Sequence, residues 1–143
     1  MPRETVVFAC VQNAGRSQMA AAFFNALADP SAARAISAGT EPADAVHPEV
    51  VTAMREVGID LGAVRPRLLS DDILARADVF ITMGCGAACP VAPGLARDDW
   101  PLPDPSNEPP DRVREIRDQV RARVVKLVTD AGWAPAARTA RGT

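Results

Sequence analysis

The sequence has no tyrosine, and it is poor in several other residue types that mark particular classes of protein. It contains one histidine, two tryptophans and three cysteines among 143 residues. So few cysteines exclude a disulfide framework, and in a cytosolic chain they indicate redox or metal chemistry instead. No apolar run approaches the roughly 18 residues of a membrane-spanning helix. The composition therefore argues against disulfide-rich scaffolds and membrane-embedded proteins.

Neither sign of charge is in large excess, since 16 basic and 18 acidic side chains leave a formal charge of -2. We therefore expect neither nucleic acid nor an anionic membrane as a partner. The N-terminus leads directly into a β-prone stretch, without the pattern of a signal peptide. This start predicts a cytoplasmic protein.

The chain does have the pattern of one α/β domain, expected to span 1–133, with 134–143 as a flexible tail that has no apolar periodicity. Strands alternating with helices predict a single-domain, four-stranded parallel sheet with helices on both faces, in flavodoxin-like order. The predicted strands are 5–9, 35–39, 79–83 and a weak fourth one at Trp100, and the predicted helices are 17–27, 48–57, a short one capped by Ser70, and 110–129. The helix 48–57 is expected to turn Val57 towards the core and to end at Gly58.

The stretch that begins at residue 10 has the features of an oxyanion-binding loop. A predicted buried strand delivers Cys10, five residues follow, and Arg16 stands where a helix begins. Backbone N–H groups of such a loop can point at one centre beside the positive end of the helix dipole, and a guanidinium suits two oxygens of a tetrahedral anion. The same field favours the thiolate form of the cysteine. The predicted oxyanion-binding residues are Val11, Gln12, Asn13, Ala14, Gly15, Arg16 and Ser17, with Gly15 as the flexible point.

A plainer interpretation is that Cys10 is an inert buried cysteine and Arg16 a surface residue, since this spacing also occurs by chance. The strand, the glycine and the helix start around the pair favour the anion-binding loop instead. The loop also resembles the signature of arsenate reductases built on the fold of the low-molecular-weight tyrosine phosphatases. Those phosphatases share the cysteine, arginine and serine, but the run Asn13 to Met19 is much more similar to the reductases, and the likeness extends from about Thr5 to Val128.

Two further cysteines, Cys85 and Cys89, follow the third predicted strand in a segment rich in glycine and alanine. Ligands of parallel sheets bind beyond the carboxyl ends of the strands, so this fold brings the segment towards Cys10. A disulfide relay fits: one thiol attacks the adduct on Cys10, and the other resolves it to an exposed pair. A half zinc site and two unrelated core cysteines are the alternatives. Besides these two cysteines, the other candidate zinc ligand is His47, which is interpreted as a loop or cap residue. A closed set of four ligands is therefore lacking, and no metal is predicted.

The resemblance supports the relay, because two resolving cysteines follow the third strand and lead into a proline in the thioredoxin-coupled reductases. This chain has a shorter spacing between them than the best-known members. Thioredoxin is the expected electron donor, and mycothiol with a glutaredoxin-like protein is the alternative. Some reductases bind potassium near the loop; Asn13 and Ser37 could match that site, but Ala21 stands where a carboxylate is expected, so the ion is not predicted.

Asp104 lies in a stiff, proline-rich loop and could protonate a departing oxygen as a general acid. Asp-Pro is also a common turn, but the resemblance favours the functional role, because this Asp-Pro carries the proton-handling carboxylate throughout the fold family. The missing tyrosine matters here, since a phosphotyrosine ring needs aromatic walls and the region before Asp104 offers only Trp100. The site is therefore predicted to take a small inorganic anion.

The resemblance and these residues together predict an arsenate reductase without a cofactor, in which phosphate or sulfate would compete with arsenate. The thiolate of Cys10 would attack arsenic, and Asp104 would assist the loss of water. Ser17 would steady the thiolate, and Asn13 would fix the shape of the loop. The alternatives are a phosphatase that uses Cys10, Arg16 and Asp104 without redox chemistry, and a thiol sensor or oxyanion-binding protein without turnover.

Overall fold

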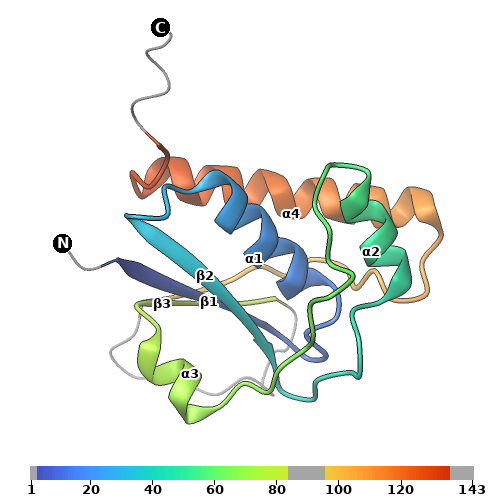
Figure 1. Ribbon diagram of the computed structural model, residues 1–143, viewed down its shortest axis with the longest axis horizontal. Helices are drawn as coiled ribbons and strands as arrows, with labels where there is room; N and C mark the ends of the chain where they lie inside the picture. Colours follow the sequence, from blue (N-terminus) through green and yellow to red (C-terminus); the bar gives the residue numbers. More distant parts are fainter. Residues whose placement is uncertain (1–2, 84–95, 136–143) are drawn as a thin grey trace, which may run out of the picture.

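The computed structural model describes residues 3–83 and 96–135. They form a four-stranded parallel sheet in the order β2-β1-β3-β4, with helices on both faces (Figure 1). The elements are β1 (Glu4–Cys10), α1 (Arg16–Leu27), β2 (Ala33–Gly39), α2 (Pro48–Arg55), α3 (Asp71–Arg76), β3 (Val79–Thr82), β4 (Ala96–Asp99) and α4 (Pro110–Asp130). The predicted fold class is confirmed. Most of the predicted tail lies outside the described residues, and its flexibility stays a prediction.

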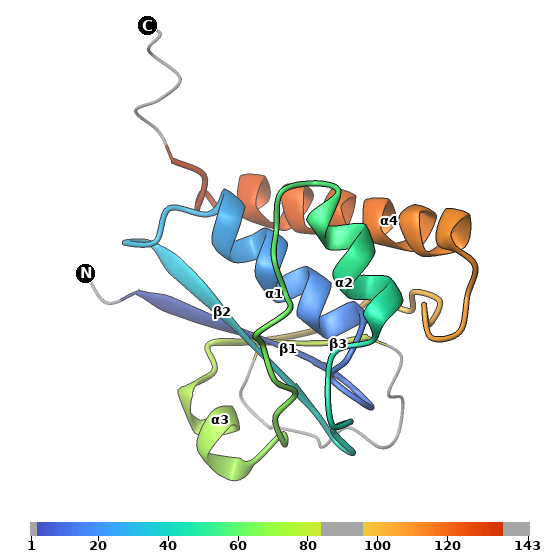
Figure 2. The same cartoon turned by 45° about the vertical axis from the view of Figure 1, so that its right-hand side comes forward.

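The helices divide unequally between the two faces of the sheet. Figures 1 and 2 show α1, α2 and α4 together on one face and α3 alone on the other. The central strand β1 is buried on both sides: Val6 and Phe8 belong to the larger core under α1 and α4, whereas Val7 and Ala9 belong to the smaller core under α3. A strand covered on both faces reads as a continuous apolar run, which is why its sequence shows no alternation.

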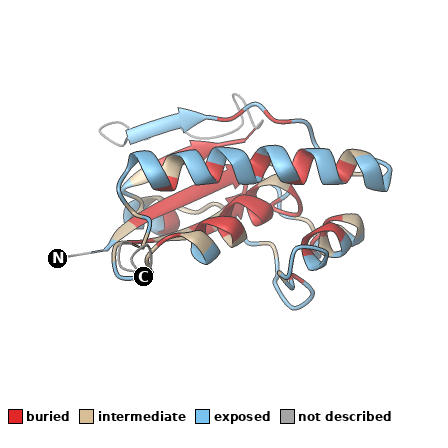
Figure 3. Ribbon diagram, turned by 90° about the horizontal axis from the view of Figure 1, so that it is seen from above, coloured by how far each residue is buried: buried red, intermediate tan, exposed pale blue. Residues whose placement is uncertain are grey.

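The fourth strand differs from its prediction. It consists of Ala96–Asp99, all exposed, and ends just before Trp100 (Figure 3). Trp100 is itself buried, and its ring centroid lies 5.4 Å from that of Phe8. An edge strand with polar residues has no apolar pattern to detect, so the sequence revealed only the tryptophan with which the chain returns to the core.

The end of α2 also departs from its prediction, because Val57 is 43% exposed instead of facing the core. Gly58 has a φ of 85°, its N–H donates to the carbonyl of Arg55, and the N–H of Ile59 donates to the carbonyl of Met54. This is the pattern of a Schellman motif with glycine in the left-handed position. The predicted terminator is therefore confirmed, and the capping turn directs Val57 outward.

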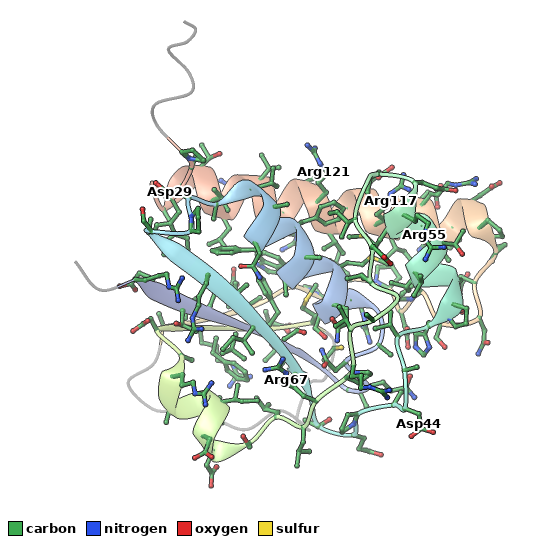
Figure 4. The ribbon with its side chains drawn as sticks, in the orientation of Figure 1. Asp29, Asp44, Arg55, Arg67, Arg117 and Arg121 are labelled. Carbon is green, nitrogen blue, oxygen red and sulfur yellow. The ribbon has the colours of Figure 1, made fainter. Side chains whose placement is uncertain are left out.

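Arginine side chains join α4 to α2. Arg117 is almost fully buried, and its Nη1 donates to the carbonyl of Ala53 (2.9 Å) and to Glu56 Oε1 (3.0 Å). In Figure 4, Arg117 lies between the two helices, whereas Arg121, one turn further along α4, points away from them. This contact helps to fix α2, whose first residues reach the site described below. No helix in the described part of the chain combines the length and the apolar character needed to span a membrane.

Candidate active site

A small hollow of about 20 Å³ opens at the carboxyl end of β1, where Cys10 is 2% exposed. Most of the predicted loop lines it, and Asp104 joins from the β4–α4 connection, so the structure brings these predicted residues together. Asn13 and Ser17 are fully buried and do not line the hollow. The lining residues are Cys10, Val11, Gln12, Ala14, Gly15, Arg16, His47 and Asp104.

The carbonyl groups of the loop are held by the segment that follows β2. The four hydrogen bonds run from Thr40 N to Cys10 O (3.2 Å), Glu41 N to Val11 O (2.8 Å), Ala43 N to Gln12 O (2.9 Å) and His47 N to Ala14 O (3.0 Å). With its carbonyls engaged by this neighbouring segment, the loop is left with its N–H groups to offer an anion. Asn13 has a φ of 51°, and a left-handed residue within such a loop is a feature of anion-binding nests.

Gly39 allows the loop to lie this close to β2. A Cβ added there would stand 2.5 Å from the carbonyl oxygen of Val11 and 2.8 Å from the backbone nitrogen of Asn13. Both of these atoms are main-chain atoms of the loop, so neither could move without changing its shape. Glycine at position 39 is therefore required by close packing.

A chain of hydrogen bonds with a fixed direction leads to the sulfur of Cys10. The N–H of Arg67 can only donate, and it donates to Asn13 Oδ1 (2.9 Å), so the amide nitrogen of Asn13 faces Ser17 Oγ (2.8 Å). Since Ser17 Oγ accepts that bond, its own hydrogen is free to point at Cys10 Sγ, 2.9 Å away. Gln18 Nε2 donates to Asn13 as well. The arrangement supplies a donor to the sulfur, which stabilises a thiolate.

Gly15 also has a packing role beside the predicted flexibility, which stays a prediction. Its φ and ψ are -141° and -93°, and an added Cβ would stand 2.9 Å from Cγ of Pro105. The glycine therefore lets the Asp104–Pro105 loop pack directly against the anion-binding loop. Close approach to Pro105 is one reason for glycine at this position.

Arg16 and Asp104 face each other across the hollow. The guanidinium is largely buried, and Nη1 donates to the carbonyl of Leu102 (2.9 Å), which fixes its orientation. Its Nη2 lies 3.9 Å from Asp104 Oδ2, beyond hydrogen-bond distance. The Asp104 side chain is 54% exposed, and its Oδ1 accepts the N–H of Ser106 at 3.0 Å. A cation held at the hollow beside a water-accessible carboxylate suits an oxyanion that must also receive a proton.

His47 is the residue that sequence reasoning missed at this site. It does stand at the N-cap of α2, as predicted, yet its side chain lines the hollow. The one signal in the sequence was that the only histidine directly precedes a helix-starting proline. Cys85 and Cys89 lie outside the described residues, so their predicted approach to Cys10 stays a prediction. Within residues 3–83 and 96–135, no group of three potential metal ligands comes together.

Comparison with known proteins identifies the family. The model of low molecular weight phosphotyrosine protein phosphatases matches residues 5–134. The chain belongs to this low-molecular-weight phosphatase family. Within it, the chain is 44% identical over 124 residues to a putative arsenate reductase of Halobacterium salinarum. The aligned region covers 84% of this chain and 87% of that protein.

Solved structures of the phosphatase family agree in the fold. A thioredoxin-dependent arsenate reductase of Corynebacterium glutamicum superposes with a TM-score of 0.77 at 37% identity, covering 90% of this chain. The chain spans only 62% of the length of that protein. An arsenate reductase in its phosphate-binding state gives a TM-score of 0.75 at 30% identity, covering 89% of this chain and 98% of its own.

Proposed function

We propose that this chain reduces arsenate to arsenite, with Cys10 as the nucleophile. The observation that carries the proposal is the buried sulfur of Cys10, which lies 2.9 Å from Ser17 Oγ at the foot of the predicted anion-binding loop. The relatives named arsenate reductases support arsenate as the anion. Phosphate and sulfate have the same tetrahedral shape, but thiols do not reduce them. The small hollow supports an inorganic ion over a phosphotyrosine ring, which would bury a large surface.

In the first step, arsenate binds to the N–H groups of residues 11–17 and to the guanidinium of Arg16. The thiolate of Cys10 attacks arsenic, a sulfur–arsenic bond forms, and one arsenate oxygen leaves as water. Asp104 supplies a proton to that oxygen, and its exposure allows solvent to reprotonate it. The loop amides and Arg16 stabilise the negative charge that remains on the oxygens.

In the second step, the thiolate of Cys85 attacks the sulfur of Cys10. A disulfide forms between them, and the electron pair of the sulfur–arsenic bond leaves with arsenic, which becomes As(III). Cys89 then attacks Cys85, which frees Cys10 and leaves a Cys85–Cys89 disulfide for thioredoxin to reduce. The sheet supports the approach of this segment to Cys10, because Met83, which precedes the cysteine segment, donates its N–H to the carbonyl of Ala9 at 2.7 Å. Free thiols of this kind also favour a reducing, cytoplasmic setting.

The relay is tested by NADPH consumption in the presence of arsenate, thioredoxin and thioredoxin reductase. We expect Cys10→Ser to abolish turnover completely. Cys89→Ser should allow at most one reduction per chain and accumulate a Cys10–Cys85 disulfide, detected by mass spectrometry of peptides. Steady turnover of Cys89→Ser with thioredoxin would overturn the relay. If the parent chain turns over with a mycothiol system but not with thioredoxin, mycothiol takes the place of thioredoxin as the electron donor.

The same assay separates a reductase from a phosphatase. A phosphatase that uses Cys10, Arg16 and Asp104 would hydrolyse phosphate esters even in a Cys85→Ser/Cys89→Ser variant. It would also fail to oxidise thioredoxin when arsenate is added. We expect the opposite result on both counts.

A further inference from the structure

His47 is fixed against the anion-binding loop by its main chain. Its backbone N–H donates to the carbonyl of Ala14 at 3.0 Å, and Pro48 follows at the first position of α2. The imidazole then lies beside Gly15, since its Cδ2 would stand 3.7 Å from a Cβ added to that glycine. The side chain reaches the hollow from α2, whereas Asp104 reaches it from the β4–α4 loop.

Among the residues that the structure describes, no hydrogen bond of the His47 ring accounts for this position. An N-cap side chain commonly accepts an N–H of the first helical turn, but the side chain of His47 makes no such bond. It also makes no hydrogen bond to any other residue in the described ranges. Its two ring nitrogens are therefore available to a ligand.

Three charged side chains lie near the imidazole. Arg16 and Asp104 share the hollow with it, and Glu49 lies on the first turn of α2. Burial raises the pKa of Glu49, but the N–H groups of Glu49 itself and of Asn107, with the nearby His47, hold it below its usual value on balance. The carboxylate accepts the N–H of Asn107 at 2.8 Å, which ties α2 to the loop that carries Asp104. This bond fixes the loop that carries Asp104 beside the helix that begins after His47.

We propose that His47 contacts the bound oxyanion and donates a ring N–H hydrogen bond to the oxygen that faces the opening of the hollow. An imidazole has at least one N–H donor whether it is neutral or protonated, so it can serve this purpose across the physiological pH range. The loop amides and Arg16 hold the anion from below, and His47 adds a donor from the side of α2. Because this contact forms with substrate and transition state alike, it governs affinity more than the rate of the chemical step.

The inference rests on the proposed function only in that an oxyanion occupies the loop, and binding of inorganic phosphate tests it without redox chemistry. Calorimetric titration of the reduced full chain should show about tenfold weaker phosphate binding in His47→Ala, the effect of one hydrogen bond to a charged ligand. His47→Gln keeps an N–H donor and should bind within about twofold of the parent chain. In the arsenate assay, His47→Ala should raise KM about tenfold and leave kcat within about twofold.

Arg55→Gln is the matched control, because Arg55 is a largely exposed cation at the far end of α2 (Figure 4). The rise of a helix puts it about 12 Å from His47 along the axis. It should bind phosphate as the parent does. Unchanged affinity in His47→Ala, equal losses in His47→Ala and His47→Gln, or an equal loss in Arg55→Gln would each overturn the inference. If the parent chain reduces arsenate and His47→Ala binds phosphate as tightly as the parent, only the role of His47 fails. If the parent chain binds no phosphate, both the role of His47 and the proposed function fail.

Discussion

The two parts of the anion site are built in different ways. The floor, residues 10–15 with Ser17, is mostly buried, and its carbonyls and side chains are held by hydrogen bonds to the segment after β2 and to Arg67. The rim, His47 and Asp104, is at least partly exposed and comes from two separate connections. The floor offers main-chain groups whose geometry is set before any ligand arrives. The rim offers side chains that water can reach, with His47 as the proposed donor to the anion and Asp104 as the proposed proton donor.

The largest effect within this comparison is expected at the rim. Asp104→Asn should lower arsenate turnover about 100-fold, because the departing oxygen loses its proton donor. Phosphate affinity should stay within about threefold of the parent, since the floor is untouched. Stopped-flow measurement of the first arsenate-dependent step and phosphate titration check the two halves of this prediction.

Asp111→Asn serves as the control for Asp104, because Asp111 lies in the first turn of α4 with its side chain 94% exposed. It should change neither quantity. A loss of phosphate binding in Asp104→Asn as large as its loss of turnover would show that the carboxylate shapes the site instead of moving a proton.

An intermediate effect is expected when the floor is distorted through its support. Gly39→Ala places a Cβ against main-chain atoms of Val11 and Asn13. It should lower the free energy of unfolding by about 1–3 kcal/mol, as overpacking does, and weaken phosphate binding about tenfold. Denaturant unfolding and phosphate titration measure the two effects.

Gly62→Ala is the matched substitution, since an added Cβ there would meet only side-chain atoms, at 3.1 Å from Asp60 and 3.6 Å from Arg55. These side chains are exposed and can move. Phosphate affinity in Gly62→Ala should equal that of the parent. Equal behaviour of the two alanine variants would contradict the view that the floor is rigidly supported from β2.

The smallest effect on the site is expected from Glu56, which joins α2 to α4 at a distance from both floor and rim. Hydrogen bonds from Arg114, and then from Arg117, hold the pKa of Glu56 below its ordinary value of 4.5. Because the folded state favours the ionised form, its contribution is complete above the unfolded pKa and disappears as the pH falls through the lower folded value. Glu56→Gln should therefore be less stable than the parent at pH 7, and the difference should vanish in acid.

Thermal unfolding between pH 7 and pH 3 measures this pH dependence, and phosphate titration should show no change in Glu56→Gln. Glu115→Gln is the control, because Glu115 pairs only with Arg112 on its own helix among the described residues. A pH-independent difference in stability would mean that Glu56 acts through packing and not through its charge.

The elements whose signals are local were predicted well. β1 and α1 follow from an apolar run, a Cys-to-Arg loop and apolar residues at helical spacing, and they are found within one or two residues of their predicted bounds. Ser70 caps α3 through a bond from the N–H of Ile73, as its position before two acidic residues indicated. β4 was misplaced because an exposed edge strand carries no apolar pattern. The cysteine segment at 85–89 lies outside the described residues and stays a prediction.

The sequence by itself determined the loop from Cys10 to Ser17, because that loop depends on residue types at short spacing. The sheet order followed from the alternation of strands and helices with right-handed connections, and the role of Asp104 followed from the family resemblance. Only the tertiary structure decided that Gly39 must be small, that Gly15 makes room for Pro105, and that the ring of His47 lines the hollow. Those facts are contacts between segments that lie from 26 to 90 residues apart in the chain. Residues that meet only after the sheet has formed share no periodicity, so the sequence carries no local signal from which these contacts could be predicted.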